Sequence, residues 1–404
     1  MVTAAVLAGR TGAETIIQFD GAANAVTTAA APAYGLQHSF EARPGLMLQF
    51  GTPRQVWRAS YLLVWNLALD GASAFSNFAD LNLAAEPSLG TMLTVGASVA
   101  RGDTAFRISQ PAADAGRPDL LDPNGGVLLT GTFHQTFAWE ASPTLRLGQE
   151  LRGSQVARPD ALDQGNSTVT GLLRLDRLFQ SDSVGLGIVA SFASLRPLDA
   201  PTLQPHLESW TNSVFGNWNR DFDDRWNGQV TAGMQLVRTV GQEAPTLSPT
   251  ASLTIRYAAG AGEASLTALH AVLPMLQTGT LSESNEVVLR GTLALDGERR
   301  RLLSGSAGFI QTRPPVVGTV EAPPSNALRG DAGLTWIFSE WLQASGRYSI
   351  AHQVLRGASS TVHVLLVGVT VRFSNAGQVP PVPSPGRRVD RSDSVGFSPE
   401  PGRP

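Results

Sequence analysis

The sequence predicts an all-β protein folded as a single antiparallel up-and-down β-barrel. Three observations lead to this prediction. Side chains alternate between apolar and polar along many segments, short and long connections alternate along the chain, and large aromatic residues gather near the short connections. Alternation with a period of two indicates extended chain, because successive side chains of a β-strand point to opposite faces.

Segment 57–69 illustrates the alternation. Its odd positions are apolar from Trp57 to Leu69, whereas Arg58 and Asn66 occupy even positions. A helical period of 3.6 would scatter the polar residues around the helix axis, so the segment is predicted as a strand. Further segments with the same pattern are 127–134, 287–295, 328–338 and 361–374.

The last of these segments, TVHVLLVGVTVRFS at 361–374, has one wholly apolar side that ends in Phe373. Its other side begins with Val362 and Val364 but ends with Gly368 and Arg372. An apolar start on a side that becomes polar is explained only if a neighbouring N-terminal element packs on it.

Residues 38–373 are predicted to form 17 strands joined by two kinds of connection. Short turns are expected at 51–54, 86–90, 141–144, 181–183, 221–225, 260–262, 296–299 and 339–340. Longer loops are expected at 101–126, 157–166, 197–208, 239–247, 274–285, 313–326 and 356–359. Because consecutive antiparallel strands deliver alternate connections to opposite ends, one end of the sheet carries turns and the other carries loops.

The strand number must be even if the barrel is of the bacterial single-chain type. Either residues 15–34 add a strand, which gives 18, or segment 38–50 is not a full strand because it contains Pro44, which gives 16. The sequence leaves 16 to 18 strands open.

Aromatic residues near the short turns predict a membrane rather than a soluble sheet. In a bilayer, indole and phenyl rings gather at the interface, whereas a soluble core would favour them in mid-strand. No run of 18 apolar residues is present, so membrane-spanning helices are excluded. The predicted girdle at the turn end consists of Trp57, Trp139, Trp218, Trp226, Trp336, Trp341 and Phe373.

The hairpins FAWEASPTLRLGQ, FGNWNRDFDDRWNGQ and LTWIFSEWLQASGRYS, with the final VGVTVRF, resemble outer-membrane β-barrel proteins of Gram-negative bacteria, in particular large porin-like barrels. The resemblance implies a bacterial outer-membrane location, short periplasmic turns, longer extracellular loops and contact with outer-membrane lipid and lipopolysaccharide. VGVTVRF is similar to the C-terminal signal read by the barrel assembly machinery. The sequence departs from the pattern because this terminal Phe lies inside the chain.

Four segments are therefore predicted. Residues 1–13 are interpreted as the remnant of a signal peptide, with an ordinary flexible N-terminus as the alternative. Residues 14–37 form either a periplasmic segment or a first strand, and 38–373 form the transmembrane barrel. Residues 374–404, with clustered prolines and few apolar residues, are expected to be a disordered periplasmic tail.

A barrel of this size cannot fill its interior with its own strand side chains, so an aqueous lumen is expected. The predicted function is passive diffusion of small polar solutes. Loop 101–126 is the longest and is the candidate to fold inward and narrow the pore; the alternative is an outward, disordered loop.

The polar faces predict the lumen chemistry. Nine arginines are assigned inward: Arg58, Arg146, Arg152, Arg174, Arg256, Arg290, Arg329, Arg347 and Arg372. Six acidic residues accompany them: Asp80, Glu140, Glu150, Asp176, Glu286 and Asp331. This excess predicts mild anion preference, because charge rings concentrate counter-ions. Alternatively, Arg329 with Asp331 and Arg174 with Asp176 neutralise each other.

Other functions are disfavoured. The net charge of −3 gives no pull toward nucleic acid, and the absence of Cys excludes thiolate chemistry. Six isolated His residues without HExxH or GxSxG motifs predict no metal site, no cofactor and no enzyme. A non-conducting barrel that displays its loops as an adhesin, receptor or assembly partner is the alternative function, and a soluble multi-sheet protein is a third reading.

Overall fold

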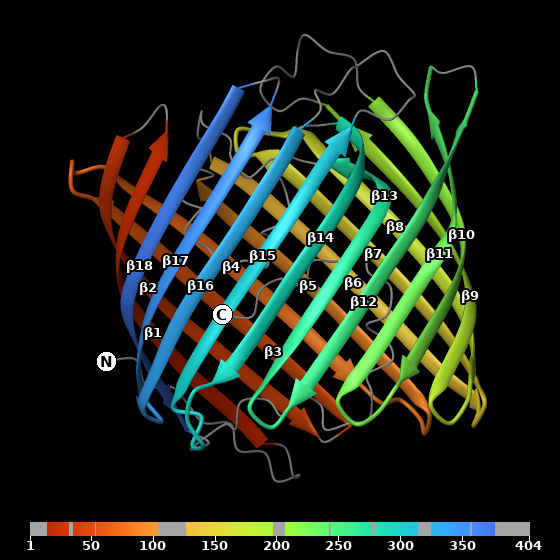
Figure 1. Ribbon diagram of the computed structural model, residues 1–404, viewed down its shortest axis with the longest axis horizontal. Coiled ribbons are helices and arrows are strands. Elements are labelled where there is room, and N and C mark those ends of the chain that lie inside the picture. The colour runs from red at the N-terminus through yellow and green to blue at the C-terminus, as the bar shows by residue number, and fades with distance from the viewer. Residues whose placement is uncertain are drawn as a thin grey trace.

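The computed structural model describes residues 14–31, 35–52, 54–103, 127–196, 207–241, 244–275, 280–313, 325–355 and 358–375. Within these ranges the chain is built from β-strands (Figure 1). No helix of these ranges has the length and apolar character needed to cross a membrane.

The described ranges contain 18 strands, which are longer than the segments of about ten residues typical of a tilted membrane-spanning strand. Their bounds are β1 (Glu14–Ala31), β2 (Gly35–Thr52), β3 (Gln55–Ala68), β4 (Ser73–Ala85), β5 (Thr91–Asp103), β6 (Val127–Ser142), β7 (Leu145–Arg158), β8 (Ala161–Leu178), β9 (Asp182–Leu195), β10 (Leu207–Asp221), β11 (Trp226–Thr239), β12 (Thr246–Ala259), β13 (Gly262–Met275), β14 (Thr280–Ala294), β15 (Arg301–Arg313), β16 (Ser325–Ser339), β17 (Leu342–Leu355) and β18 (Ala358–Ser374).

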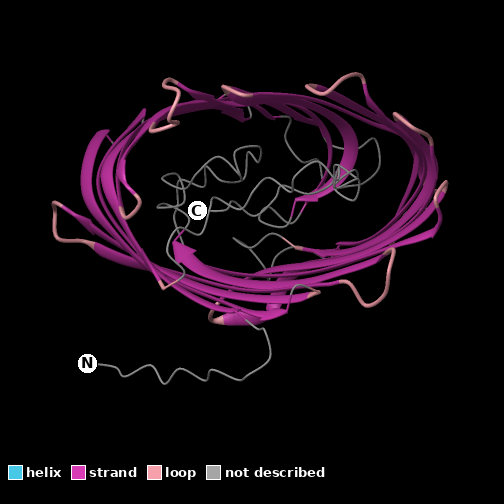
Figure 2. Ribbon diagram, turned by 90° about the horizontal axis from the view of Figure 1, so that it is seen from below, coloured by secondary structure: helices cyan, strands magenta, loops and turns pink. Residues whose placement is uncertain are grey.

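The strands form one closed antiparallel sheet. Each strand pairs with the next along the chain, and β1 pairs with both β2 and β18. Figure 2 shows the resulting ring of strands from one end. Closure leaves no edge strand with unpaired backbone groups. The predicted all-β fold and up-and-down barrel are confirmed.

The count of 18 decides between the two strand numbers left open by the sequence. β1 supplies the additional strand, and Pro44 does not interrupt β2. Pro44 pairs with Gly21 of β1, while the pairing of β2 with β3 passes from Ala42 to Gly45 without it. A proline has no N–H to donate, so it is tolerated where one neighbour makes no ladder bond. The alternative of 16 strands is therefore wrong.

Connections at one end of the barrel are short, as predicted. They lie at the bottom of Figure 1, and we call this the short-turn end. At the opposite, long-loop end, the predicted loop 157–166 is wrong, because β7 continues to Arg158 and β8 begins at Ala161. Asn166 lies inside this extension, and its side chain bonds to the backbone N–H and C=O of Arg196 at 2.5 and 2.8 Å. Polar residues were read as a loop, although they form the far end of a hairpin.

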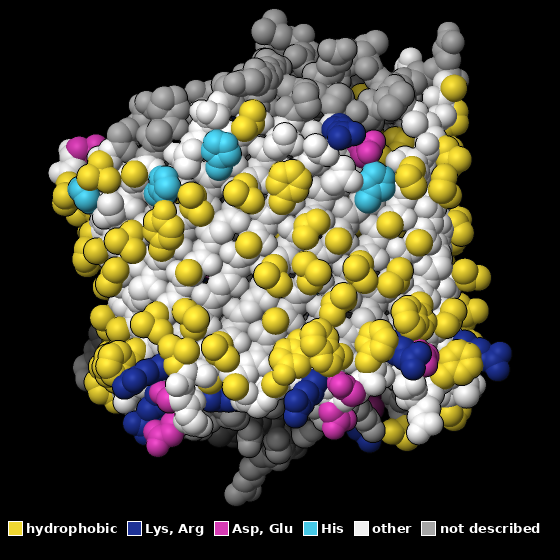
Figure 3. Space-filling view, in the orientation of Figure 1, with side chains coloured by type: hydrophobic (Ala, Val, Ile, Leu, Met, Phe, Trp, Pro, Cys, Tyr) yellow, Lys and Arg dark blue, Asp and Glu magenta, His cyan; other side chains and the backbone are white. Residues whose placement is uncertain are grey.

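Side chains alternate between an exposed outer face and an inner wall. In β18, Val367 and Phe373 are 54% and 60% exposed, whereas Val364 is 4% exposed. Val362 and Val364 pack with Val26 of β1, so the N-terminal element required by the apolar start of this strand is present. Figure 3 shows apolar side chains spread over the outer wall, with charged side chains along the short-turn rim.

Candidate functional site: the inner wall

The strand register places all ten predicted pore-lining residues on the inner wall. Directly paired residues of neighbouring strands point to the same face. Arg152 lies opposite His134, for example, and Arg146 lies opposite Glu140. The same reasoning applies to the complete set of Arg58, Arg146, Arg152, Arg174, Arg256, Arg290, Arg329, Asp331, Arg347 and Arg372. Their role in lining a conducting pore remains a prediction.

Ion pairs organise this wall. The Nε of Arg174 lies 2.8 Å from a carboxylate oxygen of Asp176, and both side chains are almost fully buried. On the other side of the barrel, Nη2 of Arg347 lies 2.7 Å from Asp331 Oδ1. Arginine is thus held next to acid in the low-dielectric wall, where an unpaired charge would be costly.

The closing seam carries a further ion pair between β18 and β1. Arg372 donates from Nε to Asp20 Oδ1 at 2.9 Å. Nε2 of Gln18 donates to both oxygens of the same carboxylate, to Oδ1 at 3.0 Å and to Oδ2 at 2.8 Å. These groups join residues from the two ends of the barrel sequence, so charge pairing and barrel closure coincide.

Two more pairs lie within single strands, where residues two apart share a face. Arg43 contacts Glu41 on β2, and Arg152 contacts Glu150 on β7. Glu41 is fully buried and also accepts a hydrogen bond of 2.8 Å from Asn24 of β1. Both contacts are made to Oε1 of Glu41, one from its own strand and one from the neighbouring strand β1.

Among the residues whose side chains the structure describes, the inner wall does not carry the arginine excess that the sequence predicted. The register adds one arginine to this described part of the wall, Arg43, but four acidic residues: Asp20, Glu41, Asp221 and Glu263. Asp20, Glu41 and Arg43 were missed because β1 and β2 mix small, polar and apolar residues and show no clear alternation. The described charges of the inner wall are consequently close to balance.

The two neutralising pairs considered from the sequence have different outcomes. Arg174 and Asp176 form the expected ion pair. Asp331, in contrast, is paired with Arg347 of the neighbouring strand and accepts a hydrogen bond from Ser306. Sequence proximity on β16 predicted Arg329 as its partner, whereas the cross-strand geometry selects Arg347.

The wall formed by β9 to β12 is mainly neutral and polar. Asn217 donates to Asp176 across the barrel wall at 3.1 Å. Gln235 bonds to the backbone C=O and N–H of Val272 at 2.9 and 3.1 Å. Other buried hydroxyl side chains on this part of the wall are Ser183, Ser209, Thr211, Ser213, Thr231, Thr239, Ser248 and Thr250. Such groups offer hydrogen bonds to a polar solute without a net charge.

Apolar clusters interrupt the polar wall, and the sequence did not predict them. Phe215 packs with Leu172 and Val189, and it is only 3% exposed. Its ring covers Gly187 of β9, where an added Cβ would come as close as 2.3 Å to the ring. A glycine on the inner face opposite an aromatic residue is the signal that could have located this contact.

The residues of the predicted aromatic girdle lie at the short-turn end and, within strands, on the outer face. Trp336 stacks on Phe338 at 5.2 Å, and the guanidinium of Arg301 lies 4.7 Å above its ring. Trp57 stacks on Phe50 at 6.4 Å. The girdle function of Trp57, Trp139, Trp218, Trp226, Trp336, Trp341 and Phe373 stays a prediction, although this placement agrees with it.

Loop 101–126 and the two terminal segments bear on predictions that the structure does not test. Residues 104–126, 1–13 and 376–404 lie outside the described residues. The inward loop, the signal-peptide remnant and the periplasmic tail therefore stay predictions.

Comparison with known proteins gives structural matches only. No protein-family model and no curated protein matches the chain. Among solved structures, Pseudomonas aeruginosa OccK2 (OpdF), in complex with glucuronate, is 10% identical with a TM-score of 0.46, over 88% of this chain and 98% of that one. P. aeruginosa OpdK with vanillate is 11% identical with a TM-score of 0.46, over 88% and 99%. The ferric-catecholate import receptor Fiu from E. coli K12 is 9% identical with a TM-score of 0.43, over 87% and 81%. Each of these matches extends over most of this chain.

Proposed function

We propose that the protein is a passive pore for small polar solutes in the bacterial outer membrane. The observation that carries the proposal is a closed barrel of 18 strands whose inner wall is charged and hydroxyl-rich, while its outer face is apolar. Barrels of this size enclose more space than their own inward side chains fill.

The outer face supports the membrane location. On β9 alone, Val184, Leu186 and Ile188 are 50%, 69% and 53% exposed. Burial of apolar surface is worth about 25 cal/mol per Å², so a continuous apolar wall in water would be strongly unfavourable. A bilayer removes that cost.

The orientation belongs to the same proposal. Outer-membrane barrels carry short turns on the periplasmic side and longer loops outside. The short-turn end is accordingly assigned to the periplasm, and lipopolysaccharide would surround the long-loop end. The final strand, ending in VGVTVRF, is proposed as the segment that the barrel assembly machinery recognises.

Selectivity is expected to be weak. The sequence predicted mild anion preference, and the near balance of inner-wall charges argues that any preference is small, because the local field depends on net charge. Arg256 is the most useful probe. Its side chain is exposed on the inner wall, and it forms no hydrogen bond or ion pair with other residues of the described ranges.

Conductance in a planar bilayer tests the proposal. Refolded protein should produce stable open channels, and asymmetric salt should give a reversal potential close to zero, because the described charges of the inner wall nearly balance. Arg256→Gln removes one positive charge from the lumen and should move the reversal potential toward cations. Arg177→Gln is the matched control, because Arg177 lies on the outer face over Phe179.

The outcomes separate the candidate functions. A folded barrel, recognised by its heat-modifiable gel mobility, that never conducts would contradict the pore and favour a barrel that displays its loops. A clear preference for either cations or anions would contradict the expected weak selectivity. Protein that remains monomeric without detergent would contradict the membrane location itself.

A further inference from the structure

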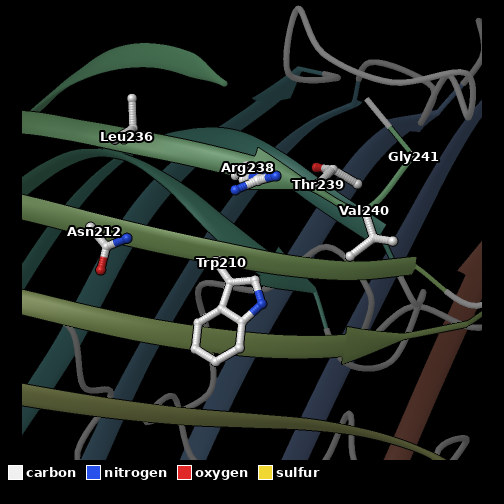
Figure 4. A pocket seen from close by; sticks show the side chains of 7 residues that line it. All are labelled: Trp210, Asn212, Leu236, Arg238, Thr239, Val240 and Gly241. Atoms are coloured by element: carbon white, nitrogen blue, oxygen red, sulfur yellow. The ribbon is translucent and has the colours of Figure 1, made fainter. Parts of the chain in front are cut away.

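A cavity of about 510 Å³ lies outside the lumen, on the outer face of the barrel at the long-loop end. Trp210 and Asn212 of β10 and Leu236 and Arg238 of β11 line it, and all four point outward by the strand register. Figure 4 shows them beside Val240, at the start of the connection to β12. The solute path proposed above does not use this site.

The apolar part of the cavity is open to the membrane. Trp210 is 51% exposed, and the ring of Phe192 on β9 lies 4.7 Å from its ring. Leu236 and Val240 are 41% and 63% exposed. Gly241 follows with φ of +90°, a conformation that favours glycine and turns the chain at the end of the cavity. An acyl chain matches this lining.

The charge at the cavity is a guanidinium without a partner in the described part of the chain. Arg238 forms no hydrogen bond or ion pair with any residue there. At the short-turn end the outward arginines are arranged differently. Arg177, Arg220 and Arg301 each lie over an aromatic ring, at 5.5, 5.5 and 4.7 Å. Among the residues that line this cavity, Arg238 carries the positive charge, and it is paired across the strands with Trp210, whose indole is exposed. Its guanidinium is available to a ligand.

We propose that this cavity binds a phosphorylated, acylated glycolipid of the outer leaflet. The guanidinium of Arg238 takes a phosphate through paired N–H donors. The indole of Trp210 and the side chain of Leu236 contact the sugar face and an acyl chain, and the amide of Asn212 bonds to a headgroup hydroxyl or amide. The inference rests on the proposed membrane orientation, which places the long-loop end in the outer leaflet.

A glycolipid fits this site better than a simple phospholipid does. The exposed indole of Trp210 offers an apolar surface to the face of a sugar ring, and a simple phospholipid has no such ring to place there. The amide of Asn212, beside it on the same face of β10, can bond to the hydroxyl or amide groups of the sugar.

Titration of the detergent-solubilised full chain with purified lipid A, followed by native mass spectrometry, tests the inference. Arg238→Gln and Trp210→Ala should each weaken lipid A binding about tenfold, as expected for loss of a charge-assisted contact or an aromatic anchor. Trp65→Ala is the matched control. Trp65 lies on the outer face at the same end, is 41% exposed and stacks on Phe75, but lines no part of this cavity.

Two ligand arms identify the chemistry. Dephosphorylated lipid A should bind wild-type protein about as weakly as lipid A binds Arg238→Gln, and phosphatidylglycerol should bind weakly to both proteins. Equal lipid A affinity for wild type and Arg238→Gln, or equal affinity for lipid A and phosphatidylglycerol, would overturn the proposal. Arg238→Lys should recover part of the affinity.

Folding and function are read separately in the same samples. Heat-modifiable gel mobility shows that each variant is folded before its binding is scored. Conductance in phospholipid bilayers without lipid A measures the pore independently. If wild-type protein forms channels but does not bind lipid A, only this inference is overturned. If wild-type protein binds lipid A but forms no channels, this inference stands and the proposed pore is contradicted.

Discussion

At the residue scale, burial sets the worth of each ion pair on the inner wall. Arg174 and Asp176 are 2.8 Å apart, and their side chains are 4% and 5% exposed. Arg300 and Glu298 are also 2.8 Å apart, but their side chains are 62% and 72% exposed. Removal of one partner from a buried pair leaves an uncompensated charge, whereas water solvates the charge left at a surface site.

Arg174→Met should therefore lower the free energy of unfolding by about 3–5 kcal/mol. Arg300→Met, the control with the same pair distance, should change it by less than about 1 kcal/mol. Urea unfolding in lipid vesicles, followed by tryptophan fluorescence, measures both. Similar losses in the two variants would show that burial does not determine how much the Arg174–Asp176 pair contributes to the free energy of unfolding.

Alternation along a strand predicts the face on which a side chain lies, but it does not predict the side chain's partner on a neighbouring strand. It placed Arg174 and Asp331 on the correct face, because side-chain direction in a strand depends only on parity along the chain. It did not identify Arg347 as the partner of Asp331, since these two residues meet across a strand boundary whose register is absent from the local pattern.

At the scale of elements, the turn between β10 and β11 is organised by one carboxylate. Asp223 accepts hydrogen bonds from the backbone N–H groups of Arg225 and Trp226 at 2.7 and 2.8 Å. These bonds, first from Arg225 and then from Trp226, lower the pKa of Asp223 below its ordinary value of 3.8. Aspartate favours such turns because its side chain can cap nearby backbone donors.

The sign of the pH effect follows from this depressed pKa. The carboxylate stabilises the turn at pH values above 3.8, and the contribution is lost as the pH falls through the lower folded-state pKa. The amide proton shifts of Arg225 and Trp226 should titrate together with a midpoint below 3.8. Asp223→Asn, which retains an acceptor oxygen but does not titrate, should abolish the transition. A midpoint at or above 3.8 would contradict the assignment.

Connections show the limits of prediction at this scale. Short turns were located to within a few residues, because turn residues end the alternation on both sides. The hairpin of β7 and β8 was cut short, since polar residues such as Asn166 carry no apolar period once the strands pass beyond the apolar wall. Tertiary hydrogen bonds to Arg196 keep that part extended.

At the scale of the whole molecule, the seam between β1 and β18 closes the barrel. The side chain of Asn375, just after β18, bonds to the backbone of two residues of β1. Its Oδ1 accepts from the N–H of Ile17 at 2.8 Å, and its Nδ2 donates to the C=O of Thr15 at 3.0 Å. The backbone N–H of Asn375 also bonds to the C=O of Ile17 at 3.2 Å. The end of the last strand is thereby fastened to the start of the first.

Asn375→Ala should lower the free energy of unfolding by about 1 kcal/mol, because two exposed hydrogen bonds are lost. The temperature at which heat-modifiable mobility disappears on a gel measures the effect. Asn326→Ala is the control, because Asn326 is exposed on the outer face and its side chain makes no hydrogen bond within the described ranges. An unchanged transition in Asn375→Ala would show that backbone pairing alone closes the seam.

The sequence by itself determined the fold class, the inward or outward direction of the predicted arginines, and the turn end at which aromatic residues gather. These properties follow from the two-residue period of an extended chain, which holds before any partner is present. Only the tertiary structure decided the closure at 18 strands, the balance of charge on the inner wall and the identity of the ion-pair partners. Arg372 meets Asp20 across 352 positions of sequence, and no local pattern can encode that distance, because it depends on how the last strand pairs with the first.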